Sequence, residues 1–283
     1  MRILNIGGIP TSLGEIINYK YHLDMIKHNY DQILLNFHLP LLEYGLHTDA
    51  PDRSQKKKLW EKYLYDIGQL FFSEPPYVLM NGPQVFCGDL IHLIKKIGIA
   101  PRKPNLDYLL CKGTSLNLGE EYIVITTKAR EVSRNIFFPL SIQLWNILKR
   151  LSTKYKIVIL GERLVEMRKE YLIYKNEIFG IYEQIIANIP TDRIIDLTVP
   201  ALGETVAALK DIQQDCLIMK EAKFTLSIGI GGNCCLSCAS SNMAIGYRND
   251  NNKLADTIYN QEYTNAVVTK DWNRFIHTLE KYL

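Results

Sequence analysis

The chain has 283 residues and a mass of 32.6 kDa, and its 33 Lys and Arg against 30 Asp and Glu give a formal net charge of +3. With 47% hydrophobic and 22% charged residues, the composition excludes a globally disordered chain, and the near-neutral balance excludes a protein that coats polyanions. At about 150 residues per domain the length favours two domains, and no apolar run approaches the ~20 residues that span a bilayer. Residues 1–8 read as a strand entering a glycine turn rather than as a signal peptide, so we expect a cytoplasmic protein with no transmembrane segment.

The first half of the chain alternates short apolar strands with helical spacing. The basic run Lys56–Lys58 is interpreted as a solvated face, with a phosphate or nucleic-acid contact as the alternative. The proline-punctuated stretch 100–105 suits a connector, and the glycine-containing stretch 112–121 suits a domain boundary, so we divide the chain into residues 1–118 and 119–283. In this half we expect strands at 3–6, 31–37 and 77–82, and helices at 16–26, 59–71 and 88–97.

The second half repeats the same alternation more regularly. We expect strands at 121–127, 156–161, 192–197 and 224–228, and helices at 139–152, at 203–213 and from about Cys234. Strands and helices joined by short connections indicate parallel sheets covered on both faces. The predicted fold is therefore α/β, with two Rossmann-like parallel-sheet domains facing each other across a cleft and the last helix able to pack back on the N-terminal domain. Ligands in such folds bind at the carboxyl ends of the strands, so the chemistry should lie in the turns that follow them.

The turn after the first strand runs from Gly7 and Gly8 to Gly14 and Glu15. It is neither a GxGxxG fingerprint nor a Walker A loop, because no matching glycine spacing and no GK[ST] follow. Glu15 stands in the first turn of the next helix. Two interpretations remain open for it: a carboxylate that favours the helix dipole, and a general base that faces the cleft.

The turn after the first strand of the second half is rich in hydroxyls and cations. Thr126 and Thr127 are followed by Lys128, Arg130 and Arg134, which together are what a diphosphate needs. The alternative is a solvated polar loop.

Two further turns follow strands of the second half. Glu162 is expected to accept hydrogen bonds from ribose hydroxyls or to cap a helix. Gly231, Gly232 and Asn233 precede a helix of small residues and are expected to form an anion-binding nest at its N-terminus.

The cysteines and histidines do not form a recognisable metal site. Cys234, Cys235 and Cys238 make a CCxxC cluster, but no second pair or nearby His completes a zinc site. We interpret them as small buried residues on a helix that packs against a strand. The six histidines are scattered, and the chain contains no DxD, GxSxG or HExxH motif. We therefore predict no metal and no other cofactor.

The order of these segments resembles glycosyltransferase family 9, the heptosyltransferase-like enzymes of the GT-B fold. The resemblance covers residues 119–245 best, through Ile123–Thr127, Phe137-Phe138-Pro139, Ile157–Glu162, Ile195–Thr198 and Ile228–Gly232. In the first half, Ser12–Ile17 is similar to the family's Ser-Leu-Gly-Asp turn. The last loop departs from the family: it has neither the usual Asp-Ser/Thr-Gly nor the His that follows, so the resemblance does not extend to the family's usual donor sugar.

The resemblance implies a role for each matching residue. Glu15 takes the place of the family's catalytic Asp and would act as the base. Thr126 and Thr127 match hydroxyls that contact the donor phosphates. Arg134, with Lys128 and Arg130 as rivals, would meet the diphosphate.

Glu162 lies near the position of the family's nucleoside-contacting carboxylate. On these grounds we predict a metal-independent, inverting glycosyltransferase that moves a sugar from a nucleotide-sugar donor to the hydroxyl of a glycan, a glycolipid or a modified nucleic acid. Residues 1–118 would form the acceptor side and residues 119–283 the donor side. The alternatives are a catalytically degenerate protein that binds a nucleotide or a partner, and a sugar-nucleotide epimerase of the same fold. The sequence leaves the oligomeric state open.

Overall fold

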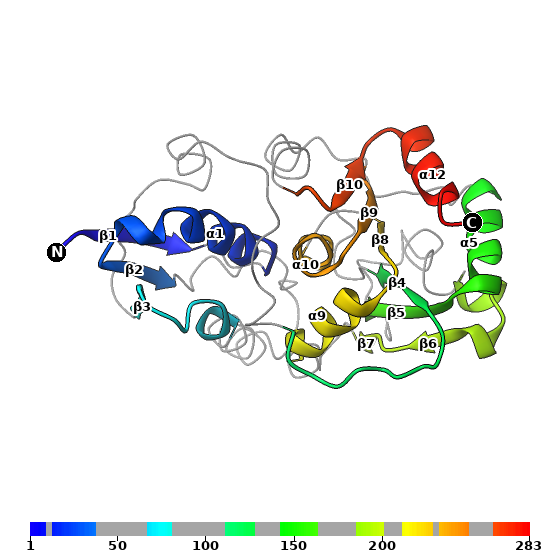
Figure 1. The fold of residues 1–283 in the computed structure, drawn as a ribbon, viewed down its shortest axis with the longest axis horizontal. Coiled ribbons are helices and arrows are strands. Elements are labelled where there is room, and N and C mark those ends of the chain that lie inside the picture. The colour runs from blue at the N-terminus through cyan, green and yellow to red at the C-terminus, as the bar shows by residue number, and fades with distance from the viewer. Residues whose placement is uncertain are drawn as a thin grey trace, which may run out of the picture.

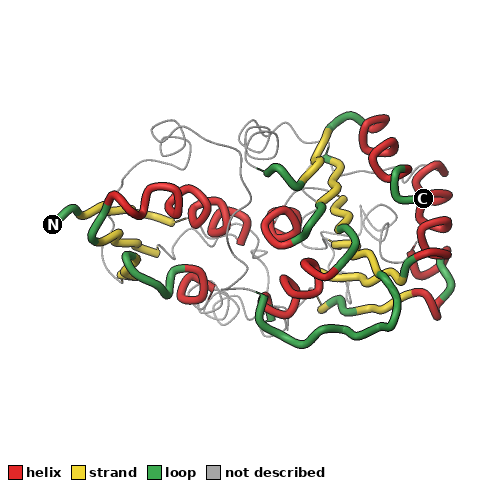
Figure 2. The backbone as a smooth tube through the Cα atoms, in the orientation of Figure 1, coloured by secondary structure: helices red, strands yellow, loops and turns green. Residues whose placement is uncertain are grey.

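The computed structural model describes residues 1–9, 13–37, 67–80, 111–127, 142–163, 185–200, 211–228, 232–248 and 263–283. Within these ranges the chain forms two parallel β-sheets, one from each half of the sequence, with helices packed on them (Figure 1, Figure 2). We refer to them as the N-terminal sheet and the C-terminal sheet. None of the helices in these ranges is long and apolar enough to cross a membrane.

The N-terminal sheet has the order β1-β2-β3, with all neighbours parallel. Its strands are β1 (Ile3–Ile9), β2 (Gln32–Phe37) and β3 (Tyr77–Met80), and α1 (Leu13–Ile26) and the short 3₁₀ helix η1 (Lys27–Asn29) lie between β1 and β2. Residues 67–71, which precede β3, are helical as predicted.

The prediction that a turn begins at Gly7 is wrong. β1 continues through Gly7 and Gly8 to Ile9, and its register against β2 shifts between Ile6 and Ile9. Such an irregularity is where glycine is tolerated inside a strand.

Helix α1 is buried on nearly every side. Every residue from 16 to 23 is buried, including Lys20, which is only 1% exposed. The Lys20 ammonium is paired with Asp24 at 2.9 Å, and the Tyr77 hydroxyl donates to the same carboxylate at 2.8 Å. Burial lowers the pKa of Lys20, and the neighbouring Asp24 carboxylate opposes that shift. A helix enclosed in this way cannot be a surface helix of the N-terminal sheet alone.

The C-terminal sheet follows the order β10-β9-β8-β4-β5-β6, with all neighbours parallel and with β7 paired to β5. Its first strand, β4, is central: the chain builds outward to β6 on one side and then crosses to β8 on the other. This is the strand order of a doubly wound, dinucleotide-type fold, and the point where the order reverses lies between β4 and β8. The strands are β4 (Tyr122–Thr127), β5 (Lys156–Arg163), β6 (Ile194–Asp196), β7 (Val199–Pro200), β8 (Thr225–Ile228), β9 (Ala244–Tyr247) and β10 (Ala266–Thr269).

Helices cover both faces of this sheet. They are α5 (Ile142–Lys154), α9 (Ile212–Glu221), α10 (Gly232–Ser240) and α12 (Trp272–Glu280), with the 3₁₀ helix η3 (Thr191–Arg193) before β6. Successive residues of β4 point to opposite faces: Ile123 and Ile125 pack in the cluster of α5 and α12, whereas Tyr122 and Val124 pack in the cluster of α9 and α10. The last helix, α12, packs mainly on β9, β10 and α5, so it covers the C-terminal sheet.

The described elements differ from the predicted ones in several places. The helix predicted at 139–152 occupies 142–154, and the third strand of this half is shorter than predicted because residues 191–193 form η3. Of the helix predicted at 203–213, residues 203–210 lie outside the described residues. The described helix α9 begins after Asp211, whose carboxylate caps it, accepting from Gln214 N at 3.1 Å. β9 and β10 were not predicted, and the last helix, α12, was expected without bounds. The helix predicted at 88–97 lies outside the described residues.

The segment that leads into β4 runs along α9. The side-chain amide of Gln214 donates to the carbonyl of Thr114 at 2.7 Å and accepts from its N–H at 2.8 Å. Gly113 lies so close that a Cβ there would meet Gln214 Oε1 at 2.5 Å. The boundary predicted after residue 118 falls within this segment.

Candidate functional site

A chain of buried hydroxyls joins the elements at the point where the strand order of the C-terminal sheet reverses. Thr126 of β4 is only 3% exposed, and its Oγ1 lies 2.9 Å from Ser227 Oγ on the neighbouring strand β8. Ser227 in turn donates to Ser237 of α10 at 3.3 Å. These hydroxyls therefore tie β4, β8 and α10 together at the carboxyl edge, the edge where the parallel strands end. Thr126 faces this internal network.

The N-terminus of α10 stands at the same edge. β8 ends at Ile228 and α10 begins at Gly232, so the first turn of α10 follows the strand directly. Exposed N–H groups and the helix dipole make such a terminus favourable for an anion. Of the predicted nest, Gly232 and Asn233 lie in this first turn, whereas Gly231 and the side chain of Asn233 lie outside the described residues.

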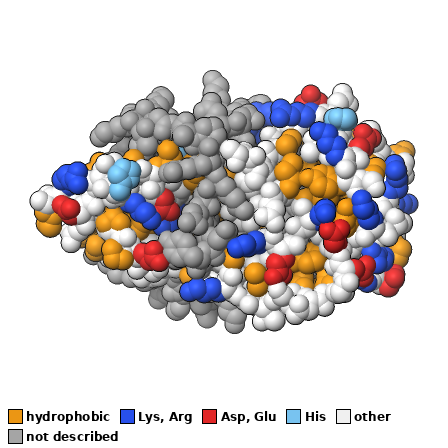
Figure 3. All heavy atoms as spheres, in the orientation of Figure 1, with side chains coloured by type: hydrophobic (Ala, Val, Ile, Leu, Met, Phe, Trp, Pro, Cys, Tyr) orange, Lys and Arg blue, Asp and Glu red, His pale blue; other side chains and the backbone are white. Residues whose placement is uncertain are grey.

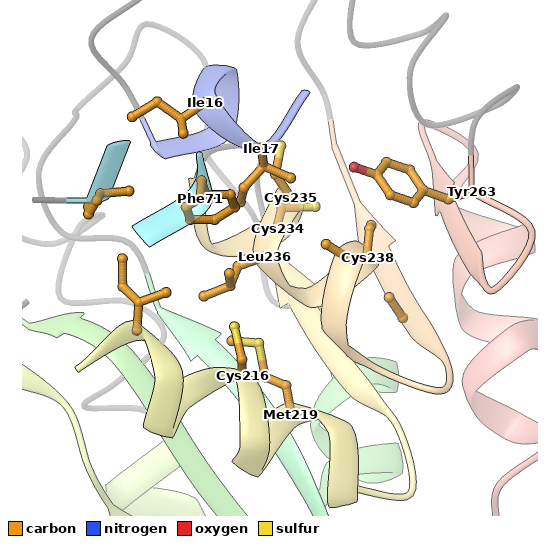
Figure 4. Packing of buried hydrophobic residues seen from close by; sticks show 14 of the residues in the cluster. Ile16, Ile17, Phe71, Cys216, Met219, Cys234, Cys235, Leu236, Cys238 and Tyr263 are labelled. Carbon is orange, nitrogen blue, oxygen red and sulfur yellow. The ribbon is translucent and has the colours of Figure 1, made fainter. Parts of the chain in front are cut away.

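Helix α1 contacts α10, which joins the two halves of the chain. The Asn18 side-chain amide lies 4.0 Å from the Cys235 sulfur, and Ile16 and Ile17 belong to the same buried cluster as Cys234 (Figure 4). We call this the helix contact. An aromatic contact adds to it: Tyr21 of α1 stacks on Tyr263, which precedes β10, with ring centroids 6.1 Å apart.

The helix contact brings two predicted site segments close together. Glu15 lies in α1 three residues before Asn18, and Asn233 lies in α10 two residues before Cys235. The backbone of the predicted base is thus about one helical turn from the contact, and so is the first turn of α10. The side chain of Glu15 lies outside the described part of the structure.

Thr127 and Glu162 share the carboxyl edge. Thr127, the last residue of β4, is paired with Gly161 of β5, and Glu162 follows. The prediction that β5 ends at Gly161 is wrong, because the strand continues to Arg163 and Glu162 is paired with Val199. The side chains of Thr127 and Glu162 are not described, and Lys128, Arg130 and Arg134 lie wholly outside the described ranges.

Gly161 has a special backbone conformation at this edge. Its φ of +107° is one that L side chains rarely adopt. Glycine is therefore favoured at this position, beyond which β5 continues past the last residue of β4.

The cysteine cluster is part of the core. Cys234, Cys235 and Cys238 are buried in α10, which packs against the strand β8 as predicted and also against α1 and α9. A hydrogen bond with Cys234, together with burial, raises the pKa of the Cys238 thiol. A protonated thiol is a poor nucleophile and metal ligand. Within the described ranges, no group of three His, Cys, Asp or Glu side chains is arranged to hold a metal ion.

Sequence reasoning missed three polar residues at the carboxyl edge. Ser227 and Ser237 complete the hydroxyl chain, and Arg248 follows β9 with its side chain fully buried. The N–H of Arg248 donates to the carbonyl of Thr269 on β10 at 3.0 Å. Arg248 could have been found by predicting Ala244–Tyr247 as a strand, because Arg248 then follows its carboxyl end.

Comparisons with known proteins gave matches among solved structures. No family model and no curated protein matches the sequence. Among solved structures, the E. coli heptosyltransferase WaaC with ADP matches over 100% of both chains, at 10% identity and a TM-score of 0.50. A family 9 glycosyl transferase from Veillonella parvula matches over 100% of this chain and 90% of its own, at 10% identity and a TM-score of 0.49. E. coli ADP-heptose lps heptosyltransferase II matches over 100% of this chain and 98% of its own, at 14% identity and a TM-score of 0.48.

The chain has the GT-B fold, with two parallel-sheet halves as the sequence predicted. The solved structure that carries this assignment is that of WaaC, which the chain matches along its whole length. At such low identity the similarity establishes the fold.

Proposed function

We propose that the protein is a cytoplasmic, metal-independent, inverting glycosyltransferase that uses a nucleotide-sugar donor. The observation that supports the proposal is the helix contact, in which Asn18 of α1, three residues after Glu15, lies against Cys235 of α10. A carboxylate and an anion-binding helix terminus are the two groups that transfer from a sugar diphosphate requires. The shared fold of WaaC, a heptosyltransferase whose structure holds ADP, supports a nucleoside diphosphate as part of the donor.

The donor would lie at the carboxyl edge of the C-terminal sheet. In doubly wound folds the crevice at the reversal point, here between β4 and β8, is where nucleotides bind. We propose that the diphosphate contacts the N–H groups of Gly231, Gly232 and Asn233, the Thr127 hydroxyl and a cation from Arg134 or Lys128. Glu162 would accept from the ribose. Thr126, with its hydroxyl bonded to Ser227, would hold β4 and β8 in register beneath the donor.

The reaction would proceed in one displacement. Glu15 accepts the proton of the acceptor hydroxyl as that oxygen forms a bond to the anomeric carbon from the face opposite the leaving group. The bond from the anomeric carbon to the phosphate oxygen breaks, and its electron pair leaves with the nucleoside diphosphate. The helix terminus and the cations stabilise the developing negative charge. The acceptor, on the side of residues 1–118, would be a glycan, a glycolipid or a modified nucleic acid.

Donor binding is tested first. We expect one nucleoside diphosphate among ADP, UDP, GDP and CDP, and its sugar conjugates, to raise the melting temperature of the full chain in EDTA as well as in Mg²⁺. Absence of stabilisation by every one of these compounds contradicts the proposal.

The role of Glu15 is tested by turnover of the donor identified in this way, with water or added glycans as acceptor. We expect Glu15→Gln to keep donor binding and to lose roughly a hundred- to ten-thousandfold in turnover, with Glu15→Asp retaining part of it. Glu121→Gln is the matched control, because Glu121 pairs with Lys223 before β4, at the opposite edge of the sheet. Full turnover in Glu15→Gln refutes the assignment of the base.

A second candidate is a protein that binds a nucleotide or a partner without catalysis. It is favoured by the last loop, where Gly231-Gly232-Asn233 replaces the Asp and His of the similar family. This candidate predicts donor stabilisation with no turnover and no effect of Glu15→Gln.

A further inference from the structure

A buried amide oxygen has no hydrogen-bond partner where α1 meets α10. Asn18 of α1 is only 5% exposed, and no donor in the described part of the chain bonds its Oδ1. The other end of the amide, Nδ2, lies 4.0 Å from the Cys235 sulfur, which is a weak acceptor. Burying an amide in this way costs free energy, because its bonds to water in the unfolded chain are not replaced. Stability therefore gives no reason for asparagine at this position.

A second asparagine on α10 shows what a structural role looks like. Asn265 precedes β10, and its Oδ1 likewise has no donor among the described residues. Its Nδ2, however, donates to the carbonyl of Cys238 at 3.0 Å and to that of Ser241 at 2.7 Å. The last carbonyls of a helix have no acceptor role within it, so these two bonds cap the end of α10. Asn265 is explained by this cap, whereas the Asn18 amide makes no comparable bond.

The directions of the two helices place the Asn18 amide between two predicted site segments. Helical side chains lean toward the helix N-terminus, so the Asn18 side chain lies over the turn of α1 that contains Glu15. By the same rule the Cys235 sulfur lies over the first turn of α10, on the side where Ile17 of α1 packs (Figure 4). The N–H groups of this first turn have no acceptor within the helix. The unpaired oxygen therefore stands close to both turns.

The chemistry of these groups selects the ligand. A carbonyl oxygen is only an acceptor, so it repels the oxygens of an ionised phosphate and pairs with an N–H or O–H donor. A hydroxyl group can donate to this oxygen and accept from a helix N–H at the same time. In the proposed reaction, the transferred sugar is the part of the substrate that lies between the diphosphate at α10 and the base at Glu15. It is also the part that is rich in hydroxyls.

We propose that Asn18 is a sugar-binding residue whose Oδ1 accepts a hydrogen bond from a hydroxyl of the transferred sugar. The inference rests on the proposed function and adds to it a recognition element for the sugar, contributed by α1. The oxygen is already removed from water and held in place by packing. A sugar that lacks the matching hydroxyl leaves it unpaired, and sites built to bond a hydroxyl discriminate strongly against such analogues.

Asn18→Leu separates recognition from folding, because leucine keeps the branching of asparagine without its polar atoms. We expect this variant to be more stable than wild type in urea, since an unpaired polar group is removed. In calorimetric titrations, the affinity for ADP, UDP, GDP and CDP should be unchanged. The affinity for their hexose and heptose conjugates, where wild type binds them, should fall by roughly ten- to a hundredfold, because a sugar hydroxyl is left without its acceptor.

Deoxy analogues of the bound sugar conjugate identify the hydroxyl. The analogue that lacks it should bind wild type and Asn18→Leu equally, because the interaction is absent from both complexes. Asn18→Ala serves for the same measurements if Asn18→Leu fails to fold.

Asn265→Leu is the matched control, because it removes the same side chain from the other end of α10. It should lower stability in urea and leave the affinity for sugar conjugates, relative to that for nucleoside diphosphates, as in wild type. The proposal is overturned if the Asn18 variants bind sugar conjugates as wild type does, or if they lose nucleoside diphosphates to the same extent. If wild type binds none of these compounds, the proposed function itself has failed, and this inference with it.

Discussion

Asp215 makes the stability of the protein depend on pH in an unusual direction. The residue lies in α9, one turn after the capping residue Asp211, in a helix that packs on α10. Burial, and secondarily the charge of Asp211, raises the pKa of Asp215 from 3.8 to about 7. The folded protein therefore holds a proton on Asp215 under conditions where the unfolded chain has released it.

Proton linkage gives the sign and the size of the pH effect on the free energy of unfolding. A carboxyl group with a raised pKa in the folded state favours folding while both states are protonated, and this advantage is lost as the pH rises to about 7. The difference between the two pKa values corresponds to about 4 kcal/mol at most, of which about 2–3 kcal/mol should be lost between about pH 5 and about pH 8.

Urea unfolding of wild type and Asp215→Asn at these two pH values measures the effect. Other titrating groups cancel in the difference between the two proteins, so we expect Asp215→Asn to gain about 2–3 kcal/mol over wild type on going from about pH 5 to about pH 8. Asp211→Asn keeps a good cap but removes the like charge, so it should shift the sensitive range to lower pH. Asp192→Asn, at an exposed site in η3, is the control. A difference between Asp215→Asn and wild type that does not change with pH refutes the reasoning.

Three substitutions at the carboxyl edge and beside it test the packing directly. Gly161→Ala should lower the free energy of unfolding by about 1–2 kcal/mol because of the positive φ, and a variant as stable as wild type in urea would contradict that conformation. Ser227→Ala removes the partner of the buried Thr126 hydroxyl and should lower the free energy of unfolding by about 1–3 kcal/mol. Adding Thr126→Val should recover part of that stability, and a double variant no more stable than Ser227→Ala argues against a direct hydrogen bond. Gly246→Ala places a Cβ 3.1 Å from a methyl of Val268, so we expect a loss of about 1–3 kcal/mol by thermal unfolding, reduced when Val268→Ala is present.

The strands that sequence reasoning found are those with uninterrupted apolar runs. β4 and β5 begin within one residue of the predicted positions, because Ile123–Ile125 and Ile157–Leu160 are buried on both faces and leave no ambiguity. β9 was not predicted because its sequence, Ala244-Ile245-Gly246-Tyr247, is short and contains a glycine. Its tertiary setting explains that glycine, since Val268 of β10 fills the space where a side chain would stand.

The candidate site was predicted as separate turns, and only the fold shows which of them meet. Asn18 and Cys235, which join α1 to α10, are 217 positions apart in the sequence. No local spacing predicts such a pair. For the same reason the buried partner of Thr126 could not be predicted, because Ser227 becomes its neighbour only when β8 crosses to the far side of β4.

On the face that Figure 3 shows, acidic and basic side chains are interspersed over the described surface, in keeping with the near-neutral charge. Under the proposed function, the phosphates of the donor would be bound at a helix end such as the N-terminus of α10, rather than by a broad basic surface on this face.

Under the proposed function, helix α1 would link catalysis to packing. A helix that is polar on one face can tilt on its sheet, but α1 is enclosed from residue 16 to residue 23 and its one buried ammonium is matched by Asp24 and Tyr77. Its first turn is therefore held by the cores of both sheets at once, and so is the backbone of Glu15. If Glu15 is the base, its position relative to α10 is set by the same buried contacts that stabilise the protein, and substitutions in the helix contact should alter stability and turnover together.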